Sequence, residues 1–558
     1  MSDVYRIADA YVDRMAALDP LAATMYGIAG HDHEMTDYSL DRASDIRGLA
    51  LRTLGELAGV RDEGSLDRIA RQSLEEHLGV VLQKHDAQEH LRNLNIIWSP
   101  LQYVRQVFDV MPRTTGADWH NIALRMAKVP NGLATYMASL QTGQSKGLSA
   151  AARQVSHGIG QVQAWTGQRG TPPFFDGLVA AFRTSGIDSK GLLADLEAGA
   201  RAANAAYVEM GRFLTDQYLP KAPQRDAFGR ARYRLWALGF NGIDLDLEQT
   251  YAWGWSELEW IEREIAATAE RILPGGGVEA AKRLLETDPA RAIEGVEPFR
   301  RWMQDLQDRT VAELDGRHFD LPAPVKRIEA MIAPPGGALA MYYTGPSEDF
   351  SRPGRTWYPT GGKTRFPLWG EVTTTYHEGV PGHHFQVANT RYLSDTLSRF
   401  QRVMAGTSGY MEGWALYAER LMTELGYLEN ADYYLGYLRS QAFRAVRIVI
   451  DIGMHLELPI PHGQPFHPGE AWTPDLGLAF LQERSHYPAD FMANEIVRYL
   501  GLPGQAIAYK VGEREWLTAR DQAKRLAGPS FNLKAWHNHA LRLGPMGLGQ
   551  MRAEMWRG

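Results

Sequence analysis

The 558-residue sequence contains no cysteine. This absence excludes disulfide cross-links, thiolate metal ligands and cysteine nucleophiles. Any metal ion would therefore have to be held by histidine, aspartate or glutamate side chains. Such ligands favour hard or borderline ions, of which zinc is a common example.

The sequence also lacks long apolar runs and clusters of basic residues. No stretch reaches the roughly 18 apolar residues of a membrane-spanning helix, and residues 1–20 lack the pattern of a signal peptide. We therefore expect no membrane association and a cytoplasmic location. The 59 Lys and Arg residues against 66 Asp and Glu residues give a formal net charge of −7. Because phosphate binding needs a basic surface, this balance argues against a nucleic-acid partner.

Helical periodicity is the dominant pattern that is present. At the N-terminus, Val4, Ile7, Tyr11 and Met15 fall on one helix face behind a capping Ser2. Similar patterns run through about 40–58, 65–94, 117–143, 149–168, 189–217 and 246–273. Long helices joined by short Pro or Gly segments are typical of a helical bundle. We therefore predict a mainly α fold.

The composition changes after Pro322. The segment 333–370 is rich in Gly, Pro and aromatic residues, which predicts a long loop region with one or two short strands. Helices are expected again at about 371–395, 407–425, 429–457, 473–484 and 488–501. Because no flexible linker separates these parts, we treat residues 1–558 as one domain, with an N-terminal helical part (1–330) and a metal-site part (331–558).

The strongest motif, at residues 376–386, reads YHEGVPGHHFQ. Zinc hydrolases commonly place two histidines four residues apart on one helix, with a glutamate after the first that takes a proton from water. Here His383 and His384 follow His377 by six and seven residues. On a straight helix His383 would lie roughly 120° from the face of His377, and His384 would lie about 10.5 Å further along the axis.

The residues between these histidines allow the chain to bend, so that the unusual spacing can still form a metal site. Pro381 removes a backbone donor and Gly382 permits unusual dihedral angles, so a kink or bulge there can bring a later histidine beside His377. We favour His383 as the second metal ligand. His384 is the alternative, and otherwise we expect it to contact the substrate. Glu378 is then the catalytic base.

A third protein ligand is expected downstream, because catalytic zinc sites commonly use three protein ligands. Glu412 suits that role because Gly409 and Gly413 flank it and allow a close approach of the backbone. Glu419 lies on the same helix face two turns later. It is either the competing ligand or a group that supports the ligands. The alternative for Glu412 is an acid that stabilises the first helical turn.

Polar residues at a four-residue spacing interrupt an apolar helix at Arg447, Asp451 and His455. Burying such groups is costly unless they are paired. One interpretation is an Arg447–Asp451 ion pair with His455 as a satisfied core histidine. The other places His455 at the catalytic site, oriented by Asp451, where it helps to stabilise an oxyanion.

Two residues near the C-terminus are further candidates for substrate contact. The planar fork of Arg498 suits a substrate carboxylate. The hydroxyl of Tyr509 suits donation to a developing oxyanion. In the alternative interpretation both side chains only pack helices together.

These segments together resemble the bacterial domain-of-unknown-function family 885. The resemblance is carried by HEGVPGHH at 377–384, EGWALY at 412–417, the helix from 447 to 455, and Arg498-Tyr499 with the following PGQA and Tyr509. Weaker likeness extends from Asp19-Pro20 through 251–254, and so over nearly the whole chain.

The resemblance implies a large helical fold similar to metallocarboxypeptidases of the Taq carboxypeptidase type, with a deep cleft and a small β-sheet near the active site. It also implies that the metal ligands are His377, His383 or His384, and Glu412, and that Glu378 is the base.

From these patterns we expect a zinc metallopeptidase that binds one Zn²⁺ per chain and hydrolyses short peptides as a carboxypeptidase or dipeptidase. His384, His455, Arg498 and Tyr509 are the expected substrate-binding residues. One alternative is a non-peptide amide or ester hydrolase with the same metal site, and another is a catalytically silent peptide-binding protein. The expected partner is a short peptide or other small molecule, and a homodimer is left open.

Overall fold

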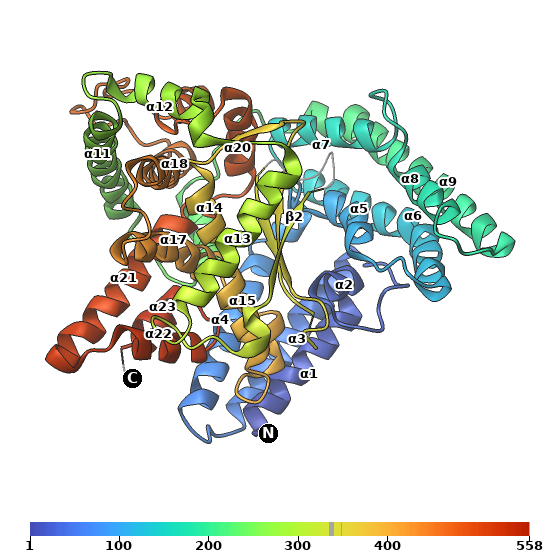
Figure 1. The fold of residues 1–558 in the computed structure, drawn as a ribbon. Helices are drawn as coiled ribbons and strands as arrows, with labels where there is room; N and C mark the ends of the chain where they lie inside the picture. The colour runs from blue at the N-terminus through green and yellow to red at the C-terminus, as the bar shows by residue number, and fades with distance from the viewer. Residues whose placement is uncertain (334–339, 348, 557–558) are drawn as a thin grey trace. The chain divides into compact units, whose positions relative to one another are not determined.

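The computed structural model describes residues 1–333, 340–347 and 349–556 (Figure 1). The chain forms two compact units. The first comprises residues 1–63, 77–227 and 500–502, and the second comprises 64–76, 228–499 and 503–558. All candidate metal ligands lie in the second unit. The expected single domain, with an N-terminal helical part (1–330) and a metal-site part (331–558), stays a prediction.

The fold is mainly α, as the sequence predicted. The helices that lie within the first unit are α1 (Asp3–Leu18), α2 (Pro20–Tyr26), α3 (Leu40–Ala58), α5 (Pro100–Val110), α6 (Gly116–Ser145), α7 (Ala152–Trp165), α8 (Phe174–Arg183) and α9 (Lys190–Arg212). Helix α4 (Ser65–Asp86) runs from the second unit into the first, and α20 (Ala489–Gly501) likewise contributes to both.

The second unit contains the remaining α-helices. These are α10 (Arg230–Asn241), α11 (Leu247–Ile272), α12 (Gly277–Thr287), α13 (Val296–Leu314), α14 (Glu371–Glu378), α15 (His383–Tyr392), α16 (Arg399–Val403), α17 (Ser408–Glu424), α18 (Ala431–Leu456), α19 (Pro474–Arg484), α21 (Ala508–Ala527), α22 (Leu533–Arg542) and α23 (Leu548–Glu554). None of the helices in the described residues is both long and apolar enough to span a membrane.

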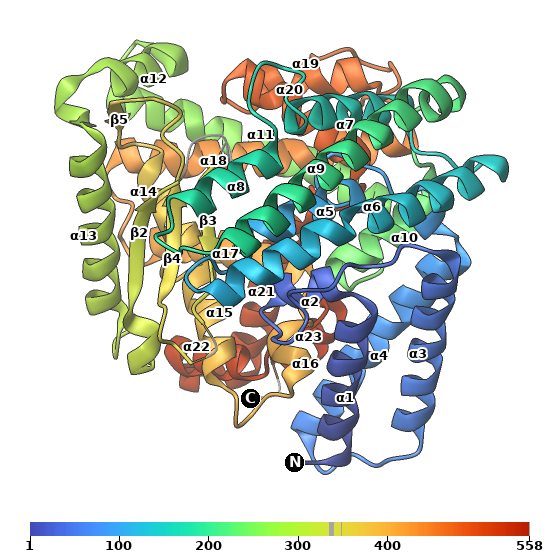
Figure 2. The same ribbon diagram turned by 90° about the vertical axis from the view of Figure 1, so that its right-hand side faces the viewer.

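The core of the first unit is formed largely by α5 to α9. Helices α6 and α9 pack side by side (Figure 2). Helix α6 begins at a capping box in which Thr115 and Asp118 bond each other's backbone. Its buried residues recur at helical spacing, among them Met126, Leu133 and Leu140. This apolar face explains why the stretch is a single long helix.

The strands are short and lie in the second unit. Strand β2 (Ile328–Ile332) pairs in parallel with β4 (Gly354–Tyr358), and β4 pairs antiparallel with β3 (Tyr342–Thr344), so the order is β2-β4-β3. Strands β1 (Ala292–Glu294) and β5 (Arg365–Pro367) form a separate antiparallel pair. Helix α13 packs against β2 (Figure 1).

The segment 333–370 contains more strand than the sequence predicted. One or two strands were expected there, and the structure has β3, β4 and β5. Two of these have three residues each, too few for a two-residue alternation to be visible in the sequence. The ring of Phe299 on α13 packs on Tyr358 of β4 and stacks on Phe366 of β5, which joins these strands to the helix. The Pro-Pro-Gly-Gly run at 334–337 lies outside the described residues.

Candidate metal centre

The expected continuous helix over 371–395 is in fact two helices. Helix α14 ends at Glu378 and α15 begins at His383, with a cis Val380–Pro381 peptide between them. The amide of Gly382 donates to the carbonyl of Tyr376 at 3.1 Å, so the chain folds back on the last turn of α14. The prediction of a distortion at Pro381-Gly382 is therefore confirmed, and it takes the form of a complete break.

Glycine is needed at position 382 for steric reasons. A Cβ atom there would lie 1.9 Å from the carbonyl oxygen of His377 and 2.4 Å from that of Tyr376. The indole of Trp414 on α17 donates to the carbonyl of Pro381 at 2.8 Å and so fixes the break to the neighbouring helix. The first histidine of the new helix is thereby held beside the last turn of the old one.

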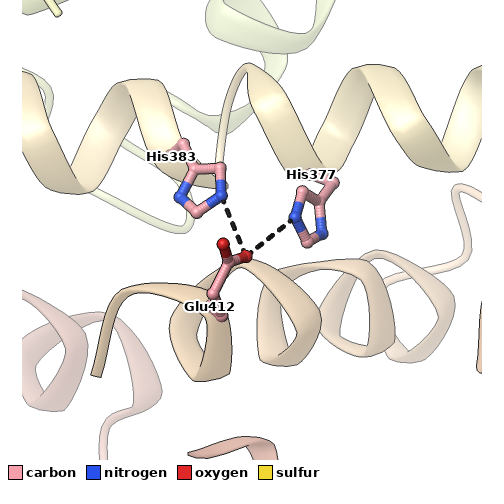
Figure 3. Close-up of side chains that lie close together, drawn as sticks. All are labelled: His377, His383 and Glu412. Carbon is pink, nitrogen blue, oxygen red and sulfur yellow. Dashed lines mark ion pairs between the residues drawn. The ribbon is translucent and has the colours of Figure 1, made fainter. Parts of the chain in front are cut away.

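The break brings His377 and His383 together with Glu412 from α17 (Figure 3). One carboxylate oxygen of Glu412 lies 3.4 Å from Nε2 of His377 and 3.3 Å from Nε2 of His383. The three candidate ligand atoms all lie within 4.8 Å of one another. Helices α14, α15 and α17 thus each direct one candidate ligand at a common point.

The close packing of α17 against α21 positions Glu412. A Cβ atom on Gly413 would lie 2.4 Å from the Cα atom of Gly512, and one on Gly512 would lie 2.1 Å from the carbonyl of Gly409. The close backbone approach that the sequence predicted for Gly409 and Gly413 is therefore confirmed. It places Glu412 opposite the N-terminal part of α21.

The donor set and its spacing fit a zinc ion. Adjacent ligands of a tetrahedral zinc site lie about 3.3 Å apart when the bonds are about 2.0–2.1 Å long, and the two distances from Glu412 agree with this value. The shared carboxylate oxygen of Glu412 is buried, and among the described residues it accepts no hydrogen bond of good geometry. A cation between the three groups would satisfy that oxygen.

A hydrogen-bonded chain behind His377 fixes its orientation. Its Nδ1 donates to a carboxylate oxygen of Glu419 at 2.7 Å, which leaves Nε2 directed at Glu412. The second oxygen of Glu419 accepts from Thr373 at 2.6 Å and from Ser440 at 3.0 Å. The structure therefore places Glu419 behind His377. A histidine that donates to a carboxylate in this way is typical of metal ligands.

The histidines and carboxylates of this cluster stabilise one another's charged forms. Burial opposes the charged form of His377, but the carboxylates of Glu412 and Glu419 outweigh it and raise the pKa to about 9. Burial also opposes the ionised form of Glu412, yet His383 and His377 hold the pKa of Glu412 well below its ordinary value. The site thus favours an ionised carboxylate beside positive charge.

Glu378 lies in the last turn of α14 beside these groups and is 9% exposed. Burial raises the pKa of its carboxyl group, although His377, His383 and the guanidinium of Arg444 act against the shift. A carboxylate with a raised pKa is better able to accept a proton near neutral pH. The location suits the base role predicted from the sequence, and the role itself stays a prediction.

Tyr509 of α21, a predicted substrate-binding residue, lies beside this cluster. Its ring stacks on that of His377 with the centroids 6.4 Å apart. Burial and the carboxylate of Glu412 raise the pKa of Tyr509, so its hydroxyl stays protonated. The hydroxyl is a donor beside the candidate metal centre.

His384 points away from the cluster, although it follows His383 directly. The side chain is fully buried. Its Nε2 donates to the carbonyl of Val325 at 2.7 Å, and its Nδ1 accepts from the hydroxyl of Tyr343 at 3.0 Å. Burial lowers the pKa of His384 to about 4, so it is neutral at ordinary pH. Both ring nitrogens of His384 therefore already form hydrogen bonds within the protein. A substrate contact by His384 stays a prediction.

His455 also has both ring nitrogens engaged. Its Nδ1 accepts from the backbone amide of Phe228 at 3.3 Å, and its Nε2 donates to the carbonyl of Tyr499 at 3.1 Å. Burial lowers the pKa of His455 to about 4. These are the bonds of a satisfied core histidine, and a substrate role for His455 stays a prediction.

The predicted pair between Arg447 and Asp451 is replaced by other contacts. Arg447 donates to a carboxylate oxygen of Glu495 at 2.9 Å. A carboxylate oxygen of Asp451 accepts from the hydroxyl of Tyr233 and from the amide of Gly504, both at 2.8 Å. Periodicity on one helix revealed the polar face, but the partners come from other elements and from the turn that contains Gly504.

Arg498 is fully engaged by neighbouring side chains. Its Nε and Nη2 donate to the two carboxylate oxygens of Glu495 at 3.1 and 2.7 Å, and its Nη1 donates to Gln505. Its predicted contact with substrate stays a prediction.

Sequence reasoning missed Arg444, Thr373 and Ser440 as parts of the site. Their spacing in the sequence could have pointed to them. Thr373 precedes His377 by one helical turn, and Ser440 precedes Arg444 by one, so each pair shares a helix face.

Comparison with known proteins identifies the family. A family model described as bacterial protein of unknown function (DUF885) matches residues 20–555. The chain belongs to this family. No match was found among curated proteins.

Solved structures resemble this DUF885 chain over its full length. A protein of Colwellia psychrerythraea, named a lipoprotein by prediction, has 22% identity and a TM-score of 0.86, covering 99% of this chain and 98% of that one. A protein of unknown function from Shewanella oneidensis, also named a lipoprotein by prediction, has 17% identity and a TM-score of 0.75, with 100% of both chains covered. At these identities the likeness shows the fold alone.

A carboxypeptidase of Pyrococcus furiosus is much less similar. It has 12% identity and a TM-score of 0.35, over 98% of this chain and 93% of that one. A likeness this low carries no argument, so the expected relationship to Taq-type metallocarboxypeptidases stays a prediction.

Proposed function

We propose that this DUF885 chain is a metal-dependent hydrolase that binds one zinc ion and cleaves short peptides. The observation that carries the proposal is the convergence of His377, His383 and Glu412 on one point. These three residues would hold the ion. Zinc, when bound, supplies Lewis acidity, which polarises a carbonyl group and lowers the pKa of a water molecule.

The chain's own residues supply the remaining functions. Glu378 accepts the proton of the attacking water and delivers it to the leaving amine, a task for which its raised pKa is suited. Tyr509 donates its hydroxyl proton in a hydrogen bond to the developing oxyanion. Glu419 holds the ring of His377 so that Nε2 faces the other ligands.

The test compares Glu378→Gln with the wild type after zinc loading. We expect zinc content to be unchanged and peptide turnover to fall by about 10²–10⁴-fold, the usual contribution of general acid–base catalysis. Glu424→Gln, at the C-terminal end of α17, is the matched control and should retain both properties. If zinc-loaded wild type cleaves no peptide, amide or ester in a broad panel, the hydrolase proposal fails and the peptide-binding alternative takes its place.

A further inference from the structure

A buried charged cluster lies beside Tyr509, on the side of α18 and α20. Arg447 donates from Nε to the hydroxyl of Tyr499 at 2.7 Å and from Nη2 to Glu495 at 2.9 Å. Arg498 binds both oxygens of the same Glu495, and the hydroxyl of Tyr499 donates to it at 2.7 Å. The carboxylate of Glu495 therefore accepts hydrogen bonds from two arginines.

This cluster carries an excess of positive charge. Burial opposes ionisation of Glu495, but Arg498 and Arg447 outweigh it and lower its pKa to about 2, so it is fully charged. The neighbouring acid, Asp451, offsets the arginines only in part, because burial raises its pKa to about 7. Two guanidinium groups thus face one full negative charge and one partial one. Uncompensated charge in a buried site is unfavourable, and an anionic ligand relieves it.

Arg447 also retains an unused donor. The residue is 5% exposed, and its buried Nη1 has no hydrogen-bond partner among the described residues. The nitrogens of Arg498, by contrast, are all engaged. A buried donor without a partner costs free energy that a ligand oxygen would recover.

The guanidinium of Arg447 is linked to the candidate metal centre through the ring of Tyr509. The guanidinium carbon of Arg447 is 4.6 Å from the centroid of the Tyr509 ring, which also stacks on His377. Arg444, one helical turn earlier on α18, lies 5.6 Å from the same centroid, and its buried Nε likewise has no partner among the described residues. Arg444 is tied through Ser440 to Glu419. Both arginines therefore flank one aromatic ring at the edge of the site.

We propose that Arg447, with Arg444 beside it, binds the free carboxylate of a peptide substrate, so that the enzyme acts on peptides near their C-terminal end. This inference rests on the hydrolase function proposed above and names its substrate class. A singly charged carboxylate matches the excess charge of the cluster. A more highly charged anion would be repelled by Glu378, Glu412 and Glu419 at the same site. Arginine suits this task because its planar fork matches the two oxygens of a carboxylate.

The test measures binding separately from turnover. The probes are N-acetyl-dialanine with a free carboxylate and the same peptide as its C-terminal amide. Calorimetric titration on zinc-loaded Glu378→Gln protein should show that the free acid binds about ten- to a hundredfold more tightly than the amide. Adding Arg447→Met should remove most of this preference. Arg447→Lys keeps a positive charge beside Glu495 but loses the planar fork, and it should reduce the preference as well.

Arg125→Lys is the matched control. Arg125 is also buried and also has an unpartnered Nη1 among the described residues, but its hydrogen bonds to Glu34 and Thr24 lie in the first unit. This change should leave the preference intact. Equal binding of acid and amide, binding of neither, or a preference that survives both Arg447 variants would overturn the carboxylate site. If the preference is present but wild-type protein cleaves neither probe nor any other peptide, the site stands as a binding site and the hydrolase function fails.

Discussion

Nδ1 of His377 lies 2.7 Å from a carboxylate oxygen of Glu419, a residue two helical turns beyond Glu412 on the same helix α17. One helix thus provides both the acid that faces Nε2 of His377 and the acid that accepts a hydrogen bond from its Nδ1. Because the two acids act on opposite nitrogens of one ring, the orientation of the His377 ring is fixed before any metal binds.

The first prediction concerns this supporting acid. Glu419→Gln should weaken zinc binding by about 10- to 100-fold, because the amide cannot stabilise positive charge on His377 as a carboxylate does. Competition with a chromophoric chelator measures the affinity. Glu424→Gln, near the end of the same helix, should bind zinc like the wild type. Unchanged affinity in Glu419→Gln would show that the bond to His377 does not support the metal.

The second prediction separates the two adjacent histidines. His383→Ala should abolish stoichiometric zinc binding, because Nε2 of His383 is directed at the carboxylate of Glu412. His384→Ala should retain zinc and lower stability, because it removes a buried ring bonded to Val325 and Tyr343. Metal analysis and urea unfolding of each variant measure these effects. Zinc lost from His384→Ala but kept by His383→Ala would reverse the assignment.

The third prediction concerns the helix break. Gly382→Ala places a Cβ atom against backbone carbonyls that belong to α14 and have little freedom to move. We expect a loss of about 1–3 kcal/mol in the free energy of unfolding, together with weaker zinc binding, because the geometry of His383 relative to His377 depends on this turn. Gly177→Ala is the control, since a Cβ atom at this exposed position in α8 has no neighbour within 4 Å. That change should be neutral or slightly stabilising. Wild-type stability of Gly382→Ala would contradict the steric argument.

The fourth prediction concerns acid stability. His455 has a pKa of about 4 in the folded protein and about 6.5 when unfolded. Above pH 6.5 both states are neutral, and between pH 6.5 and 4 only the unfolded state takes up the proton. Stability should therefore fall as the pH drops through this range, by on the order of 3 kcal/mol for this residue at about pH 4.

Urea unfolding at several pH values tests this expectation. In His455→Asn the slope of stability against pH should be smaller by about 1.4 kcal/mol per pH unit within the window, which corresponds to one proton. His120→Asn, on an exposed helix surface, is the control and should keep the wild-type slope. An equal slope in wild type and His455→Asn would show that His455 is not held neutral by burial.

The helical class and most helix positions followed from the sequence, because apolar residues at helical spacing report directly which face is buried. Helices α3, α11 and α17 lie within about two residues of their predicted limits. The candidate metal ligands were also recognisable, since three histidines and a glutamate within residues 377–384 are an unusual concentration of metal-ligating side chains. These are local properties, and local patterns are sufficient to predict them.

The tertiary structure decided which groups meet. The sequence allowed His383 or His384, and only the direction of the chain through Gly379 to Gly382 turns His383 toward His377. The partner of Arg447 was likewise undetermined, because Glu495 is distant in sequence and reaches it only through packing of α20 against α18. Ion pairs and metal sites depend on distances of a few ångströms between separate elements. Periodicity along one helix identifies a polar face, but it carries no information about what the neighbouring helix places opposite.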